Sequence, residues 1–182
     1  MNGMNCVNKI ENIETRNAYC PTMNSAPSLP SPANDYHADH IERLCRSFQH
    51  WLGRSLIDPN LSRLEAARLL YTAPYAVLSH TPSADPVFNY ANQTAQQLFD
   101  MDWLTLTTLP SRLSAEPVNQ EERERLLSRV TRQGYIDDYR GIRISRTGQR
   151  FWIENAIVWN LLDANGDPAG QAAMFDQWRF IT

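Results

Sequence analysis

The segment from Gly134 to Trp178 limits the fold of this chain more than any other. Residue types alternate along three stretches of it, which predicts three antiparallel strands. The strands are Tyr139–Ser145, Phe151–Leu161 and Gln171–Phe180. Thr147-Gly148 and Asn165-Gly166 lie between them, and an Asn-Gly pair favours the positive φ angles of a hairpin turn. The segment therefore predicts a meander of long strands, as found in small sensory α+β domains.

Two helices are predicted ahead of the meander. Apolar residues recur every three or four positions from Asp35 to Leu52, which predicts a helix that ends near Gly53. Its apolar stripe consists of Ile41, Leu44, Cys45, Phe48, Trp51 and Leu52. Asp58-Pro59 is an N-cap followed by a proline at the first helical position, so a second helix is predicted from there to Pro74. Its apolar face is Leu61, Leu64, Ala67, Leu70 and Tyr71.

The middle of the chain predicts two short strands and three helical segments. The strands are Tyr75–His80 and Val87–Ala91, and Asn92 follows as the N-cap of a short helix. A helical turn is predicted at Trp103–Leu109 and a longer helix at Asn119–Gln133. This order predicts an α+β fold, a five-stranded antiparallel sheet with helices packed on one face, preceded by the two N-terminal helices.

The 182 residues suit one domain with an appendage. Residues 1–34 are rich in Asn and Pro and show no apolar periodicity, so they predict a disordered tail. Residues 35–73 form the predicted helical extension, and residues 74–182 form the core.

Composition excludes several classes of function. The net charge of −3 and the pI of about 5.8 give no support for a nucleic-acid face. No apolar run reaches the ~20 residues of a membrane span, and the first residues lack the apolar core of a signal peptide. The three cysteines have no metal-ligand spacing. The sequence therefore predicts a cytoplasmic protein that binds no metal, no nucleic acid and no membrane.

Two segments resemble the PAS fold: FNYANQTAQQLF, and the strand–turn–strand ending RISRTGQRFWIENAIVWNLLDANGDPAGQ. Within that superfamily the chain resembles the MEKHLA family over roughly residues 38–178. The matching segments are IERLCRSFQHWLG, YTAPYAVLSH, DPVFNYAN, LPSRLSAEP, GYIDDYRGIRIS, RFWIENAIVWN and GQAAMF. The hexapeptide that names the family is absent, as is any homeodomain or zipper. The likeness is therefore to stand-alone bacterial members more than to plant transcription factors, and it implies no DNA binding.

The resemblance implies a sensory or regulatory module that binds a small ligand or a protein partner and has no catalysis of its own. It identifies no cofactor. The helix after Asn92 reads QTAQQLF and lacks the cysteine of flavin photoadducts, and Asn119–Gln133 lacks the histidine of haem-binding PAS domains. Two alternatives stay open: a small-molecule enzyme that uses the PAS-like pocket, and a purely structural interaction domain with a filled core.

Six residues are candidates for ligand contact. They are Asn89, Asn92, Trp103, Asn155, Trp159 and Gln171. On the predicted strand Phe151–Leu161, the uncharged face with Ile153, Ile157 and Trp159 is expected to point inward, which would bury Asn155. Three of the candidates also have a structural interpretation: Asn155 ties down a loop, Asn92 caps a helix and Trp103 belongs to the core. Gln171 is included because a glutamine on the last strand contacts the ring in flavin-binding PAS domains.

Two further features have alternative interpretations. The apolar stripe of the first helix predicts either a homodimer interface or packing on the chain's own sheet. Arg112 is expected to form a structural ion pair with a carboxylate such as Asp138 or Glu116, or to clamp an acidic ligand.

Overall fold

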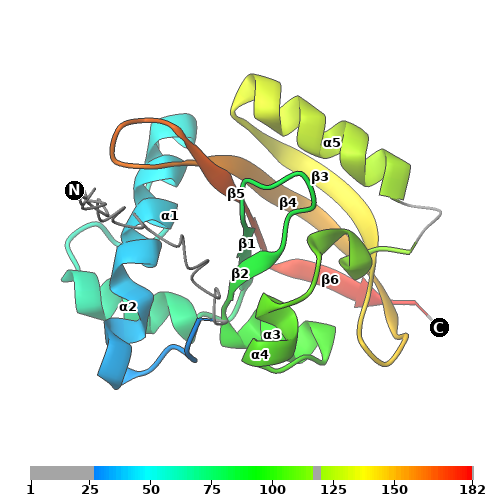
Figure 1. Ribbon diagram of the computed structural model, residues 1–182, viewed down its shortest axis with the longest axis horizontal. Coiled ribbons are helices and arrows are strands. Elements are labelled where there is room, and N and C mark those ends of the chain that lie inside the picture. Colours follow the sequence, from blue (N-terminus) through cyan, green and yellow to red (C-terminus); the bar gives the residue numbers. More distant parts are fainter. Residues whose placement is uncertain (1–26, 117–119, 182) are drawn as a thin grey trace, which may run out of the picture.

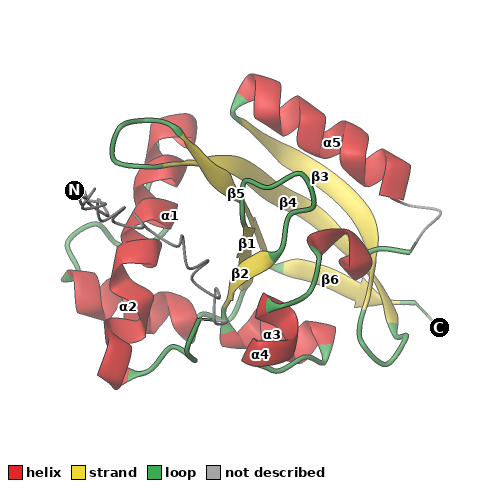
Figure 2. Cartoon of the chain, in the orientation of Figure 1, coloured by secondary structure: helices red, strands yellow, loops and turns green. Residues whose placement is uncertain are grey.

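The computed structural model describes residues 27–116 and 120–181, and its centre is an antiparallel sheet with helices on both faces (Figures 1 and 2). The strand order is β2-β1-β5-β4-β3, and β6 pairs with the first part of β4. The strands are β1 (Ala76–His80), β2 (Phe88–Ala91), β3 (Tyr135–Ile144), β4 (Arg150–Leu162), β5 (Pro168–Phe175) and β6 (Gln177–Phe180). The predicted α+β class is confirmed. The strand predicted as Gln171–Phe180 is divided between β5 and β6 at Asp176.

A bulge in β4 changes which residues face each side of the sheet. Asn155 has a φ of +51° and an exposed side chain, so the prediction that it is buried is wrong. The register explains this, because β6 pairs with β4 up to Glu154 and β5 pairs with it from Ile157. The extra residue shifts the alternation by one position. Phe151 and Ile153 therefore share one face with Ala156 and Val158, whereas Ile157, Trp159 and Leu161 share the other.

One face of the sheet is covered by the helices that follow β2. These are α3 (Gln93–Phe99), α4 (Trp103–Thr107), the 3-10 helix η2 (Ser111–Ser114) and α5 (Gln120–Gln133). Phe99 from α3 and Val130 from α5 pack on this face with Phe151, Ala156 and Phe175 of the strands. Figure 1 shows α5 lying along β3. We call this side of the sheet the inner face, because the helices that were predicted to cover the sheet lie on it.

The N-terminal helices cover the opposite, outer face. The 3-10 helix η1 (Pro32–His37) leads into α1 (Ala38–Leu52), and α2 (Arg63–Tyr71) packs against α1. Ile41, Leu44 and Phe48 of α1 are buried on this face, where the rings of Phe48 and Trp159 lie 5.0 Å apart. The stripe that suggested a dimer is thus buried on the chain's own sheet.

The second helix starts later than predicted. Ser62, rather than Asp58, is the N-cap of α2: its Oγ accepts from the N–H of Glu65, whose carboxylate accepts from the N–H of Ser62. This reciprocal capping box satisfies two helix-end donors at once. Asp58 instead accepts from the N–H of Asn60 in a turn. With this start, Leu64 is 48% exposed, so the apolar face predicted for this helix is wrong at that residue.

The segment predicted as a disordered tail falls into two parts. Residues 1–26 lie outside the described residues. Residues 27–34 are described: Pro30 is buried, and the indole Nε1 of Trp103 donates to the carbonyl oxygen of Pro27.

Candidate functional site

A small cavity lies on the inner face, between the sheet and α3, η2 and α5. Its volume is about 60 Å³, and apolar side chains such as Phe99, Leu126, Ile153 and Phe175 make up most of its wall. This volume holds a few water-sized groups and is well below the roughly 300 Å³ at which pockets for drug-sized ligands begin. A flavin or haem therefore does not fit without rearrangement of the core.

Arg143 and Tyr139 of β3 form the charged wall of this cavity. Nη2 of Arg143 donates to the Tyr139 hydroxyl at 2.7 Å, and its guanidinium carbon lies 5.1 Å from the centre of the Tyr139 ring. Gly141 makes this pairing possible, since a Cβ there would lie 2.1 Å from the Tyr139 hydroxyl. The sequence analysis missed this pair, although strand alternation does place Tyr139, Gly141 and Arg143 on one face.

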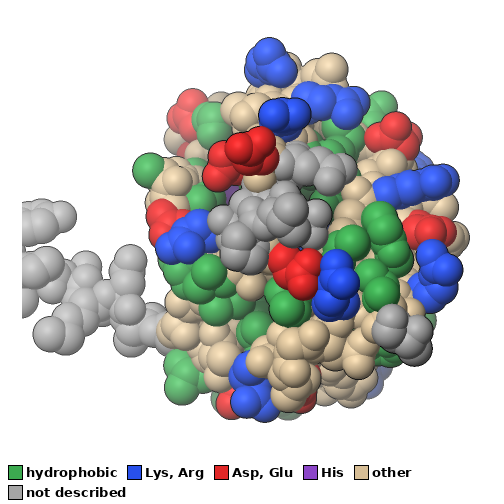
Figure 3. Space-filling view, turned by 90° about the vertical axis from the view of Figure 1, so that its right-hand side faces the viewer, with side chains coloured by type: hydrophobic (Ala, Val, Ile, Leu, Met, Phe, Trp, Pro, Cys, Tyr) green, Lys and Arg blue, Asp and Glu red, His purple; other side chains and the backbone are tan. Residues whose placement is uncertain are grey.

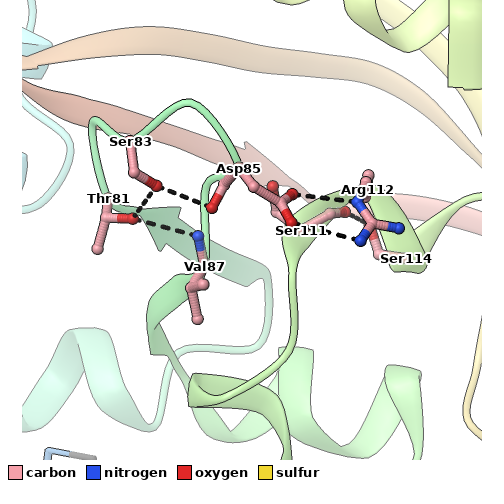
Figure 4. Close-up of polar contacts among 7 residues, drawn as sticks. All are labelled: Thr81, Ser83, Asp85, Val87, Ser111, Arg112 and Ser114. Carbon is pink, nitrogen blue, oxygen red and sulfur yellow. Dashed lines mark hydrogen bonds and ion pairs between the residues drawn. The ribbon is translucent and has the colours of Figure 1, made fainter. Parts of the chain in front are cut away.

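Next to the cavity, η2 contacts the loop between β1 and β2. Ser114 of η2 lines the cavity and donates to the carbonyl oxygen of Ser111 at 2.8 Å. Arg112 pairs with Asp85 of the loop at 3.1 Å, as Figure 4 shows, so it forms the expected structural ion pair with Asp85 as its carboxylate. Both partners are about half exposed, so this pair contributes at most ~1 kcal/mol.

Gln171 of β5 connects the cavity to α5 and to the end of β4. Its side-chain amide donates to Asn160 Oδ1 at 2.9 Å and to Thr131 Oγ1 at 3.1 Å. The carbonyl oxygen of Asn160 in turn accepts from the indole Nε1 of Trp51 in α1, at 2.9 Å. A chain of hydrogen bonds thus runs from a cavity-lining side chain to α1 on the other face of the sheet.

A second polar group lies outside the cavity, under α1. Nε2 of His40 lies 2.8 Å from Ser79 Oγ, which donates to Asn89 Oδ1 at 2.6 Å. Burial, together with the nearby charges of Arg43 and His37, lowers the pKa of His40 to about 4. Because the Ser79 proton is directed at Asn89, His40 donates to Ser79 and does not activate it as a base. The group is a structural tie between α1 and β1.

The structure does not bring the six predicted residues together. Of these, Gln171 lines the cavity, and its role as a ligand contact stays a prediction. Asn89 lies in the tie under α1, Trp159 is fully buried against Phe48, and Asn155 is exposed at the bulge. Trp103 starts α4 and is 4% exposed.

Both the oxygen and the nitrogen of the Asn92 side-chain amide form hydrogen bonds. Its Oδ1 accepts from the N–H groups of Val77 and Ala95, and its Nδ2 donates to the carbonyl oxygens of Leu70 and Tyr75. Asn92 is therefore the predicted N-cap of α3, and it also joins α2, β1 and α3.

The surface gives few other indications of function. Figure 3 shows acidic and basic side chains interspersed on the face that it presents, without a patch of one sign. None of the helices in the described part of the chain is long and apolar enough to cross a membrane. Within residues 27–116 and 120–181, no three histidine, cysteine or acidic side chains converge in an arrangement that could hold a metal ion.

Comparison with known families and proteins gives a consistent result. The family model described as MEKHLA domain matches residues 38–180. The homeobox-leucine zipper protein HOX29 of Oryza sativa subsp. indica is 27% identical over 168 residues, which cover 88% of this chain and 19% of that protein. Homeobox-leucine zipper protein ATHB-8 of Arabidopsis thaliana is 28% identical over 170 residues, covering 90% of this chain and 20% of that protein. The chain thus spans about one fifth of the length of these relatives.

Solved structures with a similar fold are PAS and light-oxygen-voltage domains. The PAS domain of a protein from Colwellia psychrerythraea has a TM-score of 0.55 and 17% identity, covering 65% of this chain and 95% of that chain. An RNA-binding light-oxygen-voltage receptor has a TM-score of 0.54 and 17% identity, covering 66% of this chain and 33% of that chain. At such identities the likeness shows the fold alone. The predicted closer likeness to stand-alone bacterial members stays a prediction, since the relatives named here are plant proteins.

Proposed function

Since the chain belongs to the MEKHLA domain family and has the PAS-like fold, we propose that it is a sensory or regulatory module in which a small ligand in the inner-face cavity repositions α1. The observation that carries this proposal is the hydrogen-bonded chain Gln171–Asn160–Trp51, which joins the cavity wall to α1. A ligand acts as a switch only if it interacts differently with two arrangements of the protein. Any group that occupies the cavity would displace the Gln171 side chain, which lines it, and would thereby change the hydrogen bonds of the Gln171 amide.

The contact between Trp51 and Gly134 supports the same route. Gly134 joins α5 to β3 with a φ of +93°, and a Cβ there would lie 2.3 Å from the ring of Trp51. The Gly134 carbonyl oxygen also accepts from the N–H of Asn160 at 2.8 Å. Displacement of α5 or of the end of β4 would therefore move the surface on which Trp51 rests.

A binding role is favoured over catalysis by where the perturbed titratable groups lie. The pKa of His40 is lowered to about 4, burial raises the pKa of Cys45 to about 11, and burial also raises the pKa of Tyr90. All three belong to α1 or to the packing beneath it, on the outer face. A catalytic pocket would be expected to gather such groups at the cavity.

The proposal is tested by placing a neutral probe in the cavity and observing α1. The protein, labelled with 5-fluorotryptophan, has five ¹⁹F resonances, and Trp51→Phe assigns one of them. Pressurised xenon enters apolar cavities. We expect it to shift the methyl resonances of Ala156 and Ala173, which line the cavity, together with the fluorine resonance of Trp51.

Two variants make the test specific to the proposed route. In Gln171→Leu the cavity resonances should still respond to xenon while that of Trp51 no longer moves. Gln133→Leu, at an exposed glutamine of α5, should behave as the unaltered protein. If xenon shifts the cavity resonances but never that of Trp51, or if Gln171→Leu leaves the Trp51 shift intact, the proposed coupling is wrong.

A further inference from the structure

Arg143 is buried, and no carboxylate of the described residues pairs with it. Its exposed fraction is 9%, and none of the ion pairs among the described residues includes it. Two described acidic residues at the edge of the inner face pair with other arginines: Glu116 with Arg150 at 3.0 Å, and Asp100 with Arg146 at 3.6 Å. A buried positive charge is costly unless it is paired, so its presence in a cavity wall requires an explanation.

The hydrogen bonds that Arg143 does make leave room for a planar anion. A guanidinium has five N–H donors, and Arg143 uses one on Nη1 for the carbonyl oxygen of Ile142 and one on Nη2 for Tyr139. Three of the five remain: one on Nε and one on each Nη. Two of these donors that lie on adjacent nitrogens and point the same way would match the two oxygens of a carboxylate in the bidentate arrangement that arginine favours.

The remainder of the cavity indicates what such a carboxylate would carry. Phe99, Leu126 and Ile153 provide an apolar wall, and the volume of about 60 Å³ admits a group of only a few heavy atoms. We propose that the cavity binds a short-chain aliphatic monocarboxylate, with its carboxylate on Arg143 and its alkyl group among these side chains. This inference rests on the proposed function, of which it specifies the ligand class.

The direct test measures the thermal stability of the full chain against short carboxylates and their neutral amides. Butyrate should raise the melting temperature in a saturable manner at constant ionic strength, because it binds the folded state alone. Butyramide, which has the same shape and no charge, should bind about 10- to 100-fold more weakly, the factor expected for charge-assisted hydrogen bonds. Sodium chloride at the same concentration should have no saturable effect. If acetate, propionate and butyrate all fail to bind, or if butyramide binds as well as butyrate, the proposal is wrong.

Substitutions then assign the binding to Arg143. Arg143→Met should abolish the response to butyrate, whereas Arg140→Gln, at an exposed arginine on the same strand, should retain it. Arg143→Met should also raise the melting temperature of the ligand-free protein, because it removes a buried charge that lacks a counter-ion. If Arg143 serves only to hold Tyr139, Arg143→Met should instead lower the melting temperature of the ligand-free protein, and butyrate should raise the melting temperature of the folded variant as much as that of the unaltered protein. That result would overturn the assignment.

A variant at Gly141 gives an independent readout. Gly141→Ala leaves the charge in place but forces Tyr139 away from Arg143, since its Cβ would lie 2.1 Å from the Tyr139 hydroxyl. Affinity for butyrate should fall, and the ring resonances of Tyr139 should shift in the ligand-free protein. Unchanged butyrate affinity in a folded Gly141→Ala variant would count against the proposed geometry.

Failure of this inference is distinguishable from failure of the proposed function. If xenon or butyramide shifts the cavity and Trp51 resonances while the carboxylates do not bind, the coupling holds and the ligand class is wrong. If xenon occupies the cavity without any response at Trp51, the proposed coupling fails whatever the carboxylates do.

Discussion

The stability of this protein is expected to fall as the pH decreases from about 6.5 to about 4, because His40 is held in its neutral form. His40 lies on α1 with its Nε2 2.8 Å from Ser79 Oγ and its ring 5.5 Å from that of Tyr90. Burial is the main cause that lowers its pKa from 6.5 to about 4, and the charges of Arg43 and His37 add to it. Protonation therefore costs more in the folded state than in the unfolded chain.

The size of the effect follows from the shift. With a folded pKa of about 4 and an unfolded pKa of 6.5, the unfolded chain binds more protons between these values, so the free energy of unfolding falls with pH. The stability is fully present above pH 6.5 and is lost as the pH falls through 4. At ~1.4 kcal/mol per unit, the loss is about 2 kcal/mol by pH 5 and about 3 kcal/mol by pH 4. For a chain of this size, 3 kcal/mol corresponds to a decrease of roughly 6–12 °C in the melting temperature.

Urea unfolding measured at pH 7, 6 and 5 tests this prediction before most carboxylates titrate. His40→Gln should be less sensitive than the unaltered protein by about 2 kcal/mol between pH 7 and pH 5. His50→Gln is the matched control, because His50 is an exposed histidine on the same helix. If His40→Gln and the unaltered protein lose the same free energy over this range, the reasoning is refuted.

Three further predictions concern single positions. Asn92→Ala should lower the free energy of unfolding by about 3 kcal/mol, because the N–H groups of Val77 and Ala95 and the carbonyl oxygen of Tyr75 lose their Asn92 partner, while that of Leu70 still accepts from Ala73. Asp102→Ala, at the exposed cap of α4, should cost about 1 kcal/mol, and equal losses in urea unfolding would contradict this. Asn155→Gly should be neutral or stabilising by up to about 1 kcal/mol, since Asn155 is exposed and has a φ of +51°, and a clear loss of stability would show that its side chain matters. In a variant whose other two cysteines are replaced by serine, Cys45 should react with iodoacetamide at pH 8 about 100-fold more slowly than an exposed thiol, because burial raises its pKa to about 11. Reaction of Cys45 at the rate of glutathione would refute this prediction.

The sequence predicts those features of the fold that depend on neighbouring residues. The helix cap at Asn92 was predictable because a cap and its helix are adjacent in the chain. The other partners of Asn92, such as the carbonyl oxygens of Leu70 and Tyr75, are set by how α2 meets the sheet, which no local pattern shows. The start of α2 was mispredicted because two capping signals compete within five residues, and the reciprocal box at Ser62 prevailed over Asp58.

The candidate site was harder to predict because it depends on register. Strict alternation along β4 placed Trp159 on the same face as Phe151, whereas the bulge at Asn155 places them on opposite faces. The bulge in β4 lies where its neighbour changes from β6 to β5, and the sequence of a single strand does not show such a change of neighbour. The strand pattern does include Arg143, between Ile142 and Ile144. That no carboxylate of the described residues pairs with it depends on the tertiary structure around it, which the pattern of one strand does not show.

The attachment of α1 to the sheet suggests how the module would transmit a signal. Among the described residues, four hydrogen bonds join α1 to the strands: His40 to Ser79 of β1, Arg46 to the carbonyl oxygen of Leu162 at 3.3 Å, Ser47 to the N–H of Leu162 at 2.9 Å, and Trp51 to Asn160. The last three attach the C-terminal half of α1 to the end of β4, and Asn160 also accepts from the cavity residue Gln171. The His40 tie lies about 16 Å away along the helix, at the helical rise of 1.5 Å per residue.

The two ends of α1 are therefore expected to respond to different changes, one to ligand binding and the other to pH. Under the proposed function, a ligand in the cavity would act on the Trp51 end through β4, whereas protonation would act on the His40 end. We expect ligand binding to tilt α1 about its His40 end, with amide hydrogen exchange increasing near His50 and staying constant near Ile41. An equal change at both ends would instead mean that α1 is released as a whole, and the outer face of the sheet, with Tyr90 and Trp159, would become available to a protein partner.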